Sequence, residues 1–124
     1  MSILPPLPYS PSLFRSSPDS VVVFYRWDLV AREELRSALN STEVSDYAGW
    51  LDRIEGPLAA LIDRIEVRPS GGDLQAHRIP TSKEDRRKWF EDNLPSRLVG
   101  EVCGAIVAGA YDSELVGKSS QHTV

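Results

Sequence analysis

Hydrophobic and polar positions change their period once between Val21 and Leu39, where a strand pattern passes into a helix pattern. Nearly every residue from Val21 to Trp27 is β-branched or aromatic, which fits a pleated surface covered on both faces. Asp28 then suits the cap of a helix, because its carboxylate can accept hydrogen bonds from free backbone N–H groups. The apolar stripe of that helix consists of Ala31, Leu35, Ala38 and Leu39. Its solvated side consists of Arg32, Glu33, Glu34 and Arg36.

A second helical period runs from Tyr47 to Ile65, and Ser45 or Asp46 could cap it. Gly56-Pro57 interrupts this period, which predicts either a kink or two helices with Pro57 first in the second. The turn sequence from Pro69 to Asp73 then predicts a hairpin between Ile65 and Ile79, at a sheet edge because prolines flank it.

Two further helices follow the hairpin. Thr81 with Glu84 three residues later forms a capping-box pattern, and Trp89 and Phe90 supply the buried side of the helix that it opens. Asn93-Leu94 ends that helix, and Pro95 starts a last one that runs to Tyr111. This last helix is apolar nearly all round, which predicts that it lies in the core or is shared with a partner.

Glycines interrupt the last helix and lower its intrinsic helicity by roughly 1 kcal/mol each relative to alanine. We expect close packing to offset this cost, so that a neighbouring backbone approaches the helix at Gly100, Gly104 and Gly109. Gly100, Gly104 and Val107 are therefore candidate interface residues.

The first 20 residues form a proline-rich stretch that favours an extended chain. Five large apolar side chains lie between the prolines, and we expect them to dock on the domain itself or on a neighbour. As candidate partner-binding residues we take Leu4, Leu7, Tyr9, Leu13 and Phe14. The chain then divides into an extended arm (1–20), a globular domain (21–111) and a polar tail (112–124). The fold class expected is α+β, with a small antiparallel sheet covered by four or five helices.

Composition narrows the possible partners. The 124 residues carry a formal net charge of -4, which gives no electrostatic basis for binding nucleic acid. The cluster from Arg86 to Lys88 is interspersed with acidic residues and is interpreted as a solvated helix face. Cys103 is the single cysteine, so it forms no internal disulfide, and its apolar surroundings predict a buried, inert thiol. No stretch approaches the ~20 apolar residues of a membrane span, so we expect a soluble protein.

The residues carry no recognisable catalytic, metal or cofactor site. His77 and His122 lack a second ligand at metal-site spacing, and His77 is interpreted as a surface histidine. Three tryptophans, Trp27, Trp50 and Trp89, are expected to anchor the core. Arg26 should pair with Glu33 or Glu34, because an unpaired charge among apolar neighbours is costly. We therefore expect that the protein is not an enzyme.

The string Val-Val-Phe-Tyr-Arg-x-x-x-x-Ala-Arg-Glu-Glu-Leu at Val22 to Leu35 resembles small bacteriophage tail assembly chaperones. The later order is similar to theirs too, with a leucine-isoleucine segment at Leu58 to Ile65, a glycine turn, a helix start at Ile79 to Glu84, and a Leu-Pro before an apolar last helix. The resemblance spans Ser20 to about Ala110. It implies a non-enzymatic protein that holds hydrophobic surface of a tape-measure or tail tube protein until assembly.

Two functions within phage morphogenesis stay open. One is a transient tail assembly chaperone in the host cytoplasm. The other is a virion-resident subunit, such as a capsid decoration or cement protein, whose arm lies along its neighbours. In both, the partners are phage tail, tape-measure or capsid proteins, and the chain could form a homo-oligomer, with no nucleic acid or membrane involved. A small bacterial enzyme is the alternative from another class.

Overall fold

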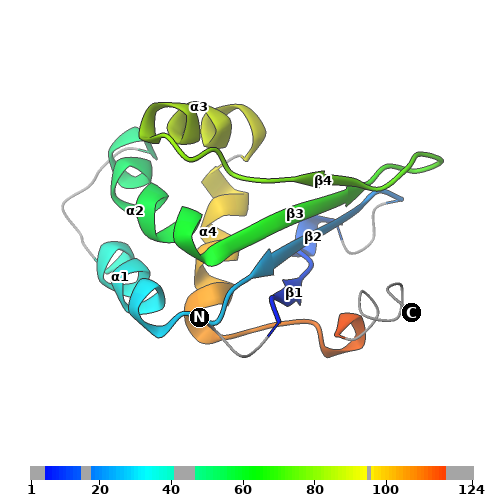
Figure 1. The fold of residues 1–124 in the computed structure, drawn as a ribbon, viewed down its shortest axis with the longest axis horizontal. Coiled ribbons are helices and arrows are strands. Elements are labelled where there is room, and N and C mark those ends of the chain that lie inside the picture. The colour runs from blue at the N-terminus through cyan, green and yellow to red at the C-terminus, as the bar shows by residue number, and fades with distance from the viewer. Residues whose placement is uncertain (1–4, 15–17, 41–46, 95, 117–124) are drawn as a thin grey trace.

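The structure is a computed structural model that describes residues 5–14, 18–40, 47–94 and 96–116. Within these ranges the chain forms a four-stranded antiparallel sheet and four α-helices, which confirms the α+β class (Figure 1). Two short 3-10 turns, η1 (Ser12–Phe14) and η2 (Ser113–Leu115), complete the elements.

The strands follow one another across the sheet in chain order: β1 (Leu7–Tyr9), β2 (Ser20–Tyr25), β3 (Ile62–Arg68) and β4 (Gln75–His77). Every neighbouring pair is antiparallel, with Pro8 opposite Phe24 and Ile65 opposite both Val23 and His77. The predicted hairpin is thus confirmed as β3 and β4, although β3 begins three residues before the expected Ile65. β1 lies within the stretch expected as an arm, and it is an edge strand, the one sheet position in which proline is tolerated.

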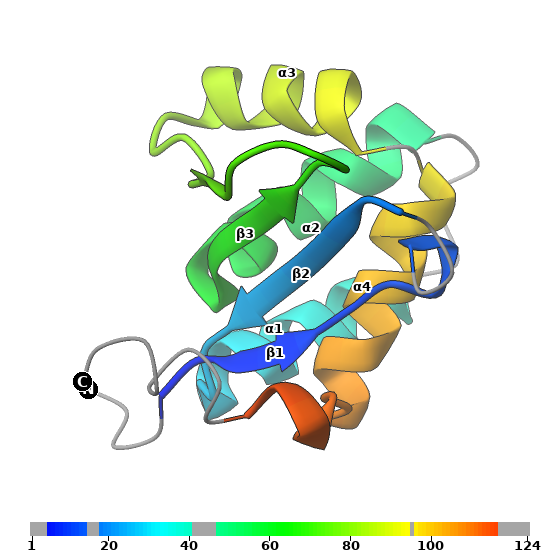
Figure 2. The same ribbon diagram turned by 90° about the vertical axis from the view of Figure 1, so that its right-hand side faces the viewer.

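The helices are α1 (Leu29–Leu39), α2 (Tyr47–Leu61), α3 (Lys83–Asn93) and α4 (Ser96–Ala108). Figure 2 shows α1, α2 and α4 behind one face of the sheet, while α3 lies beside them near β4. No α-helix of the described residues covers the opposite face. There Phe24 is nonetheless buried, and the guanidinium of Arg64 lies 4.0 Å from the centre of its ring.

Several predicted helix boundaries differ in the structure, and the last helix ends at Ala108 rather than at Tyr111 because Gly109 leaves the helical conformation there. α2 is one helix that contains Pro57, so the two-helix alternative is wrong, and it ends at Leu61 because the chain enters β3 at Ile62. The proposed caps Ser45 and Asp46 lie outside the described residues. The Asp28 cap is confirmed, since Oδ1 accepts the Ala31 N–H at 3.1 Å.

The cap of α3 lies one residue later than predicted. Ser82, not Thr81, accepts the Asp85 N–H, at 3.2 Å. Asp85 then occupies the third helical position, so the capping-box spacing is kept one residue further along the chain. At the other end Asn93 is the last helical residue, as expected.

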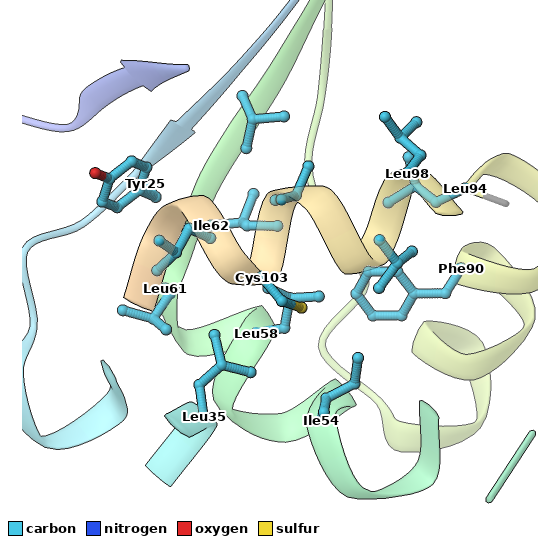
Figure 3. Packing of buried hydrophobic residues seen from close by; sticks show 14 of the residues in the cluster. Tyr25, Leu35, Ile54, Leu58, Leu61, Ile62, Phe90, Leu94, Leu98 and Cys103 are labelled. Atoms are coloured by element: carbon cyan, nitrogen blue, oxygen red, sulfur yellow. The ribbon is translucent and has the colours of Figure 1, made fainter. Parts of the chain in front are cut away.

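A single core fills the space between the sheet and the helices (Figure 3). It takes Val23 and Tyr25 from β2, Leu35 from α1 and Phe90 from α3, and a larger share from α2 and α4. The fully buried members of α2 and α4 are Leu51, Ile54, Leu58, Leu61, Val99, Cys103 and Ile106. Trp50 and Trp89 pack against this core while partly buried, whereas Trp27 is 36% exposed, so the prediction that it anchors the core is wrong.

Charged side chains link elements whose contacts were not predicted from the sequence. Arg86, expected on a solvated face, donates from Nε to Oε2 of Glu55, which is only 5% exposed, and so ties α3 to α2. Arg26 is paired as expected, but its partner is Asp63 at 3.0 Å rather than Glu33 or Glu34. The reason is that β3 begins beside the end of β2, which places Asp63 nearer than the solvated side of α1.

Candidate functional site

The candidate partner-binding residues of the arm lie on the domain itself, where the structure describes them. Leu7, Tyr9 and Phe14 are partly buried and pack against the core cluster. Leu4 lies outside the described residues, and the side chain of Leu13 is not described. The three placed side chains therefore use much of their apolar surface within their own chain.

Glu101 on α4 holds the last residue of β1 and the segment that follows it. Its Oε2 accepts the Tyr9 hydroxyl at 2.5 Å and the Ser12 N–H at 2.7 Å, while Oε1 accepts the Ser12 hydroxyl at 2.7 Å. One carboxylate thus receives three donors from the proline-rich stretch. Hydrogen bonds to a charged acceptor are stronger than neutral ones, so Glu101 is the main polar attachment of this segment to α4.

The outer edge of β1 is covered by the chain that follows α4. The Asp112 N–H donates to the Pro8 carbonyl at 2.8 Å, and the Ser10 N–H donates to Oδ2 of Asp112 at 2.6 Å. An unpaired strand edge is a template for association, and covering it removes that template. β1 is consequently protected at this position.

The close approach predicted for the α4 glycines is wrong at two positions. A Cβ atom added at Gly100 or Gly104 would meet no other atom within 4 Å, and both residues are exposed. Val107, the third candidate interface residue, is partly buried against the core. Gly100 and Gly104 instead lie on the solvated side of a helix that buries the stripe through Leu98, Val102 and Ala105.

At Gly109 the predicted close approach is confirmed. Its φ of +73° lies in the left-handed region, and a Cβ atom there would stand 2.9 Å from Cη2 of Trp27. The partner is a side chain rather than a backbone, and the residue ends α4 rather than continuing it, as glycine commonly does.

Arg32 completes the junction between α1 and the end of α4. Its guanidinium lies 4.0 Å from the centre of the Trp27 ring, and it donates to the carbonyl oxygens of Ile106 at 3.2 Å and Val107 at 2.9 Å. These carbonyls belong to the last turn of α4, where a cation is favoured. Arg32, assigned to the solvated side from the sequence, is therefore a structural residue that holds Trp27 in place.

Beside this junction lie Leu29 and Val30, the two most exposed large apolar side chains among the described residues. Leu29 is 65% and Val30 69% exposed on the first turn of α1, next to Trp27, while Tyr111 is 48% exposed two residues after Gly109. We call these four residues, Trp27, Leu29, Val30 and Tyr111, the apolar end. Both helix termini concerned lie at the same end of the fold in Figures 1 and 2.

A second apolar feature is a groove of about 150 Å³ between the sheet and the C-terminal half of α3. Val21, Ile65 and Val67 form its floor, and Trp89 and Leu94 form its wall, with His77 and Asn93 beside them. A cavity of about this volume accommodates a benzene-sized group. The exposed position of His77, predicted from the sequence, is confirmed.

Within the described ranges, no group of three or more His, Cys, Asp or Glu side chains is arranged to hold a metal ion. In the same residues, no helix is both long enough and apolar enough to cross a membrane. Cys103 is buried, as expected, and burial raises the pKa of its thiol to about 12.

A signal for the apolar end is present in the sequence at the start of α1. Leu29 and Val30 are apolar, but neither falls on the stripe of α1 that Ala31 and Leu35 begin. Side chains off that stripe face away from the core, so two large apolar residues there are exposed by the geometry of the helix.

No protein-family model, curated protein or solved structure matches the chain.

Proposed function

We propose that the protein acts without catalysis, by binding another protein during bacteriophage morphogenesis, in the manner of a tail assembly chaperone. The observation that carries this proposal is the apolar end, where Leu29 and Val30 are each about two thirds exposed. Clustered apolar side chains on a protein surface mark interaction sites. The partner is a phage structural protein, such as a tape-measure or tail tube subunit, whose own hydrophobic surface needs cover before assembly.

The segment that resembles tail assembly chaperones is also the segment that carries most of the apolar end. The string from Val22 to Leu35 forms the end of β2 and the first half of α1. The four residues between its two halves, Trp27 to Val30, supply three members of the apolar end. The resembling part thus provides the strand before these side chains and the part of α1 that follows them.

The strength expected from this surface suits a transient complex. Full burial of a large apolar side chain contributes about 1.5–3 kcal/mol, and the four residues have roughly a third to two thirds of their surface left to bury. The total is about 3–7 kcal/mol, and the apolar surface that the client buries adds about as much toward the cost of association. Such a surface supports reversible binding, which a chaperone that leaves its client requires.

The alternative, a virion-resident decoration subunit, rested on an arm that lies along neighbouring subunits. Leu7, Tyr9 and Phe14 pack on their own domain, so the described part of the arm gives that alternative no support. Residence in the virion therefore remains as an outcome of the experiment.

The experiment is complementation of a phage from which the gene has been deleted, with mass spectrometry of the purified particles. We expect Leu29→Glu combined with Val30→Glu to abolish complementation and to weaken binding to the purified client about 100-fold. Acidic residues suit the first turn of a helix, so this variant should fold. Ser37→Glu, on an exposed position of the same helix, is the matched control.

A chaperone should be absent from mature particles and yet required for their formation. Stoichiometric presence in the particles would select the resident subunit instead. Full complementation by the double variant would refute a role for the apolar end.

A further inference from the structure

The two edges of the sheet differ in how they are protected. Asp112 covers β1, whereas β4 ends the strand order on the other side. All residues of the hairpin from 71 to 78 are exposed, and the hairpin projects from the body of the molecule (Figure 1). An exposed edge of this kind pairs readily with another strand.

The polar side chains along β4 and its flanks are complementary to those of a second, antiparallel copy of the same strand. Asp73 precedes the strand and His77 ends it, while the guanidinium of Arg78 donates to the Asp63 carbonyl of its own chain at 3.2 Å. In an antiparallel pair of identical strands the start of one lies beside the end of the other, so both acidic residues meet basic ones. This complementarity favours a second copy of the chain over an unrelated strand.

We propose that β4 pairs antiparallel with β4 of a second copy, which joins the two four-stranded sheets into one. A two-fold axis through Gln75 places Asp73 opposite the partner's His77 and Leu74 opposite the partner's Ala76. Opposite residues share a face of a sheet, so in the first pair the imidazole can donate a hydrogen bond to the carboxylate, and the second pair is apolar. Leu74, which is 48% exposed in the single chain, thereby gains a partner.

The other nearby symmetric register, centred on Ala76, is less favourable. It places Leu74 opposite Arg78 and Asp73 opposite Ile79, so neither a charge pair nor an apolar pair forms directly across the strands. The register centred on Gln75 therefore follows from the side chains that β4 presents.

The dimer itself does not depend on the proposed function. Only its effect on client binding rests on that function. The hairpin and the start of α1 lie at opposite sides of the molecule (Figure 1). Pairing through β4 leaves both apolar ends accessible, and two linked binding surfaces raise the apparent affinity for a repetitive or elongated client.

The test is sedimentation equilibrium of the full chain, whose monomer mass is 13.8 kDa. We expect twice that mass at high concentration. His77→Glu places two carboxylates across the two-fold axis, and Asp73→Lys removes the carboxylate that faces the partner's imidazole, so each should raise the dissociation constant about tenfold. An equimolar mixture of the two variants restores both charge pairs, so it should recover the wild-type dissociation constant as a heterodimer.

Asp92→Lys makes the same charge change on the exposed surface of α3 and is the matched control. Circular dichroism of each variant establishes that it is folded. A wild-type chain that is monomeric up to about 100 µM would overturn the proposal. So would a dimer that neither single variant weakens, or a mixture that does not recover. None of these measurements involves a client, so their failure is distinct from failure of the proposed function.

Discussion

The contact of Glu101 with Tyr9 and Ser12 contributes to holding residues 7–14 on the folded domain, together with the pairing of β1 and β2. Three hydrogen bonds converge on this carboxylate from Tyr9 and Ser12. Glu101→Ala removes all three and leaves α4 intact, because alanine is the best helix former. The variant therefore reports on the attachment of the segment rather than on the helix.

The expected loss follows from the burial of the donors. The Tyr9 hydroxyl is partly buried, and its bond should contribute about 1 kcal/mol. The two donors of Ser12 are exposed and can turn to water, so together they add about 1 kcal/mol. We expect Glu101→Ala to lower the free energy of unfolding by about 2 kcal/mol and the Tm by roughly 6–10 °C.

Urea denaturation gives the free energy, and hydrogen exchange locates the change. Amide exchange should accelerate in residues 7–14 and much less in β3. The control is Glu91→Ala, which removes an exposed pair with Arg87 at 3.5 Å and should cost under about 0.5 kcal/mol. Equal effects of the two substitutions, or unchanged exchange in residues 7–14, would refute the attachment. Deletion of Met1 to Ser16 should accordingly destabilise the domain, contrary to what a freely extended arm implies.

Two further predictions concern buried groups. Arg86→Leu leaves the Glu55 carboxylate buried without its partner, so it should lower the free energy of unfolding by about 3–5 kcal/mol in urea titrations. The double variant Glu55→Leu with Arg86→Leu should recover most of this loss. A double variant no more stable than the single one would contradict the prediction. Because the pKa of Cys103 is raised from 9.0 to about 12, the thiol stays protonated at pH 8. Iodoacetamide at that pH should therefore label it only as fast as the domain opens, as measured by mass spectrometry. Labelling at the rate of a free thiol would show instead that the thiol is accessible.

Local patterns in the sequence predicted most of the elements. The strand from Val21, the cap at Asp28 and the hairpin turn at Pro69 are all determined within a few residues, and all three occur. The shift of the α3 cap from Thr81 to Ser82 is a small error of the same local kind. The boundary at Leu61 was missed because Ile62 and Ile65 satisfy a helical and a strand pattern equally well, and only pairing with β2 decides between them.

The long-range contacts could not be predicted from these patterns. Arg26 pairs with Asp63 and Arg32 reaches the end of α4, and each contact joins segments far apart in the chain. The same limit affected the candidate site. Apolar side chains in a proline-rich stretch fit a groove of a partner or of the domain itself equally well, and the sequence does not say which groove exists.

The place of the apolar end in the fold also bears on how it would bind. Trp27 lies between the Arg32 guanidinium and Gly109, so its ring has little freedom to lose. Leu29 and Val30 extend from a helix turn that Asp28 caps. A surface ordered before binding avoids part of the entropy cost of association, which matters most where the apolar area is small. The junction of Arg32, Trp27 and Gly109 therefore supports binding, because it keeps the Trp27 ring in one arrangement at the surface.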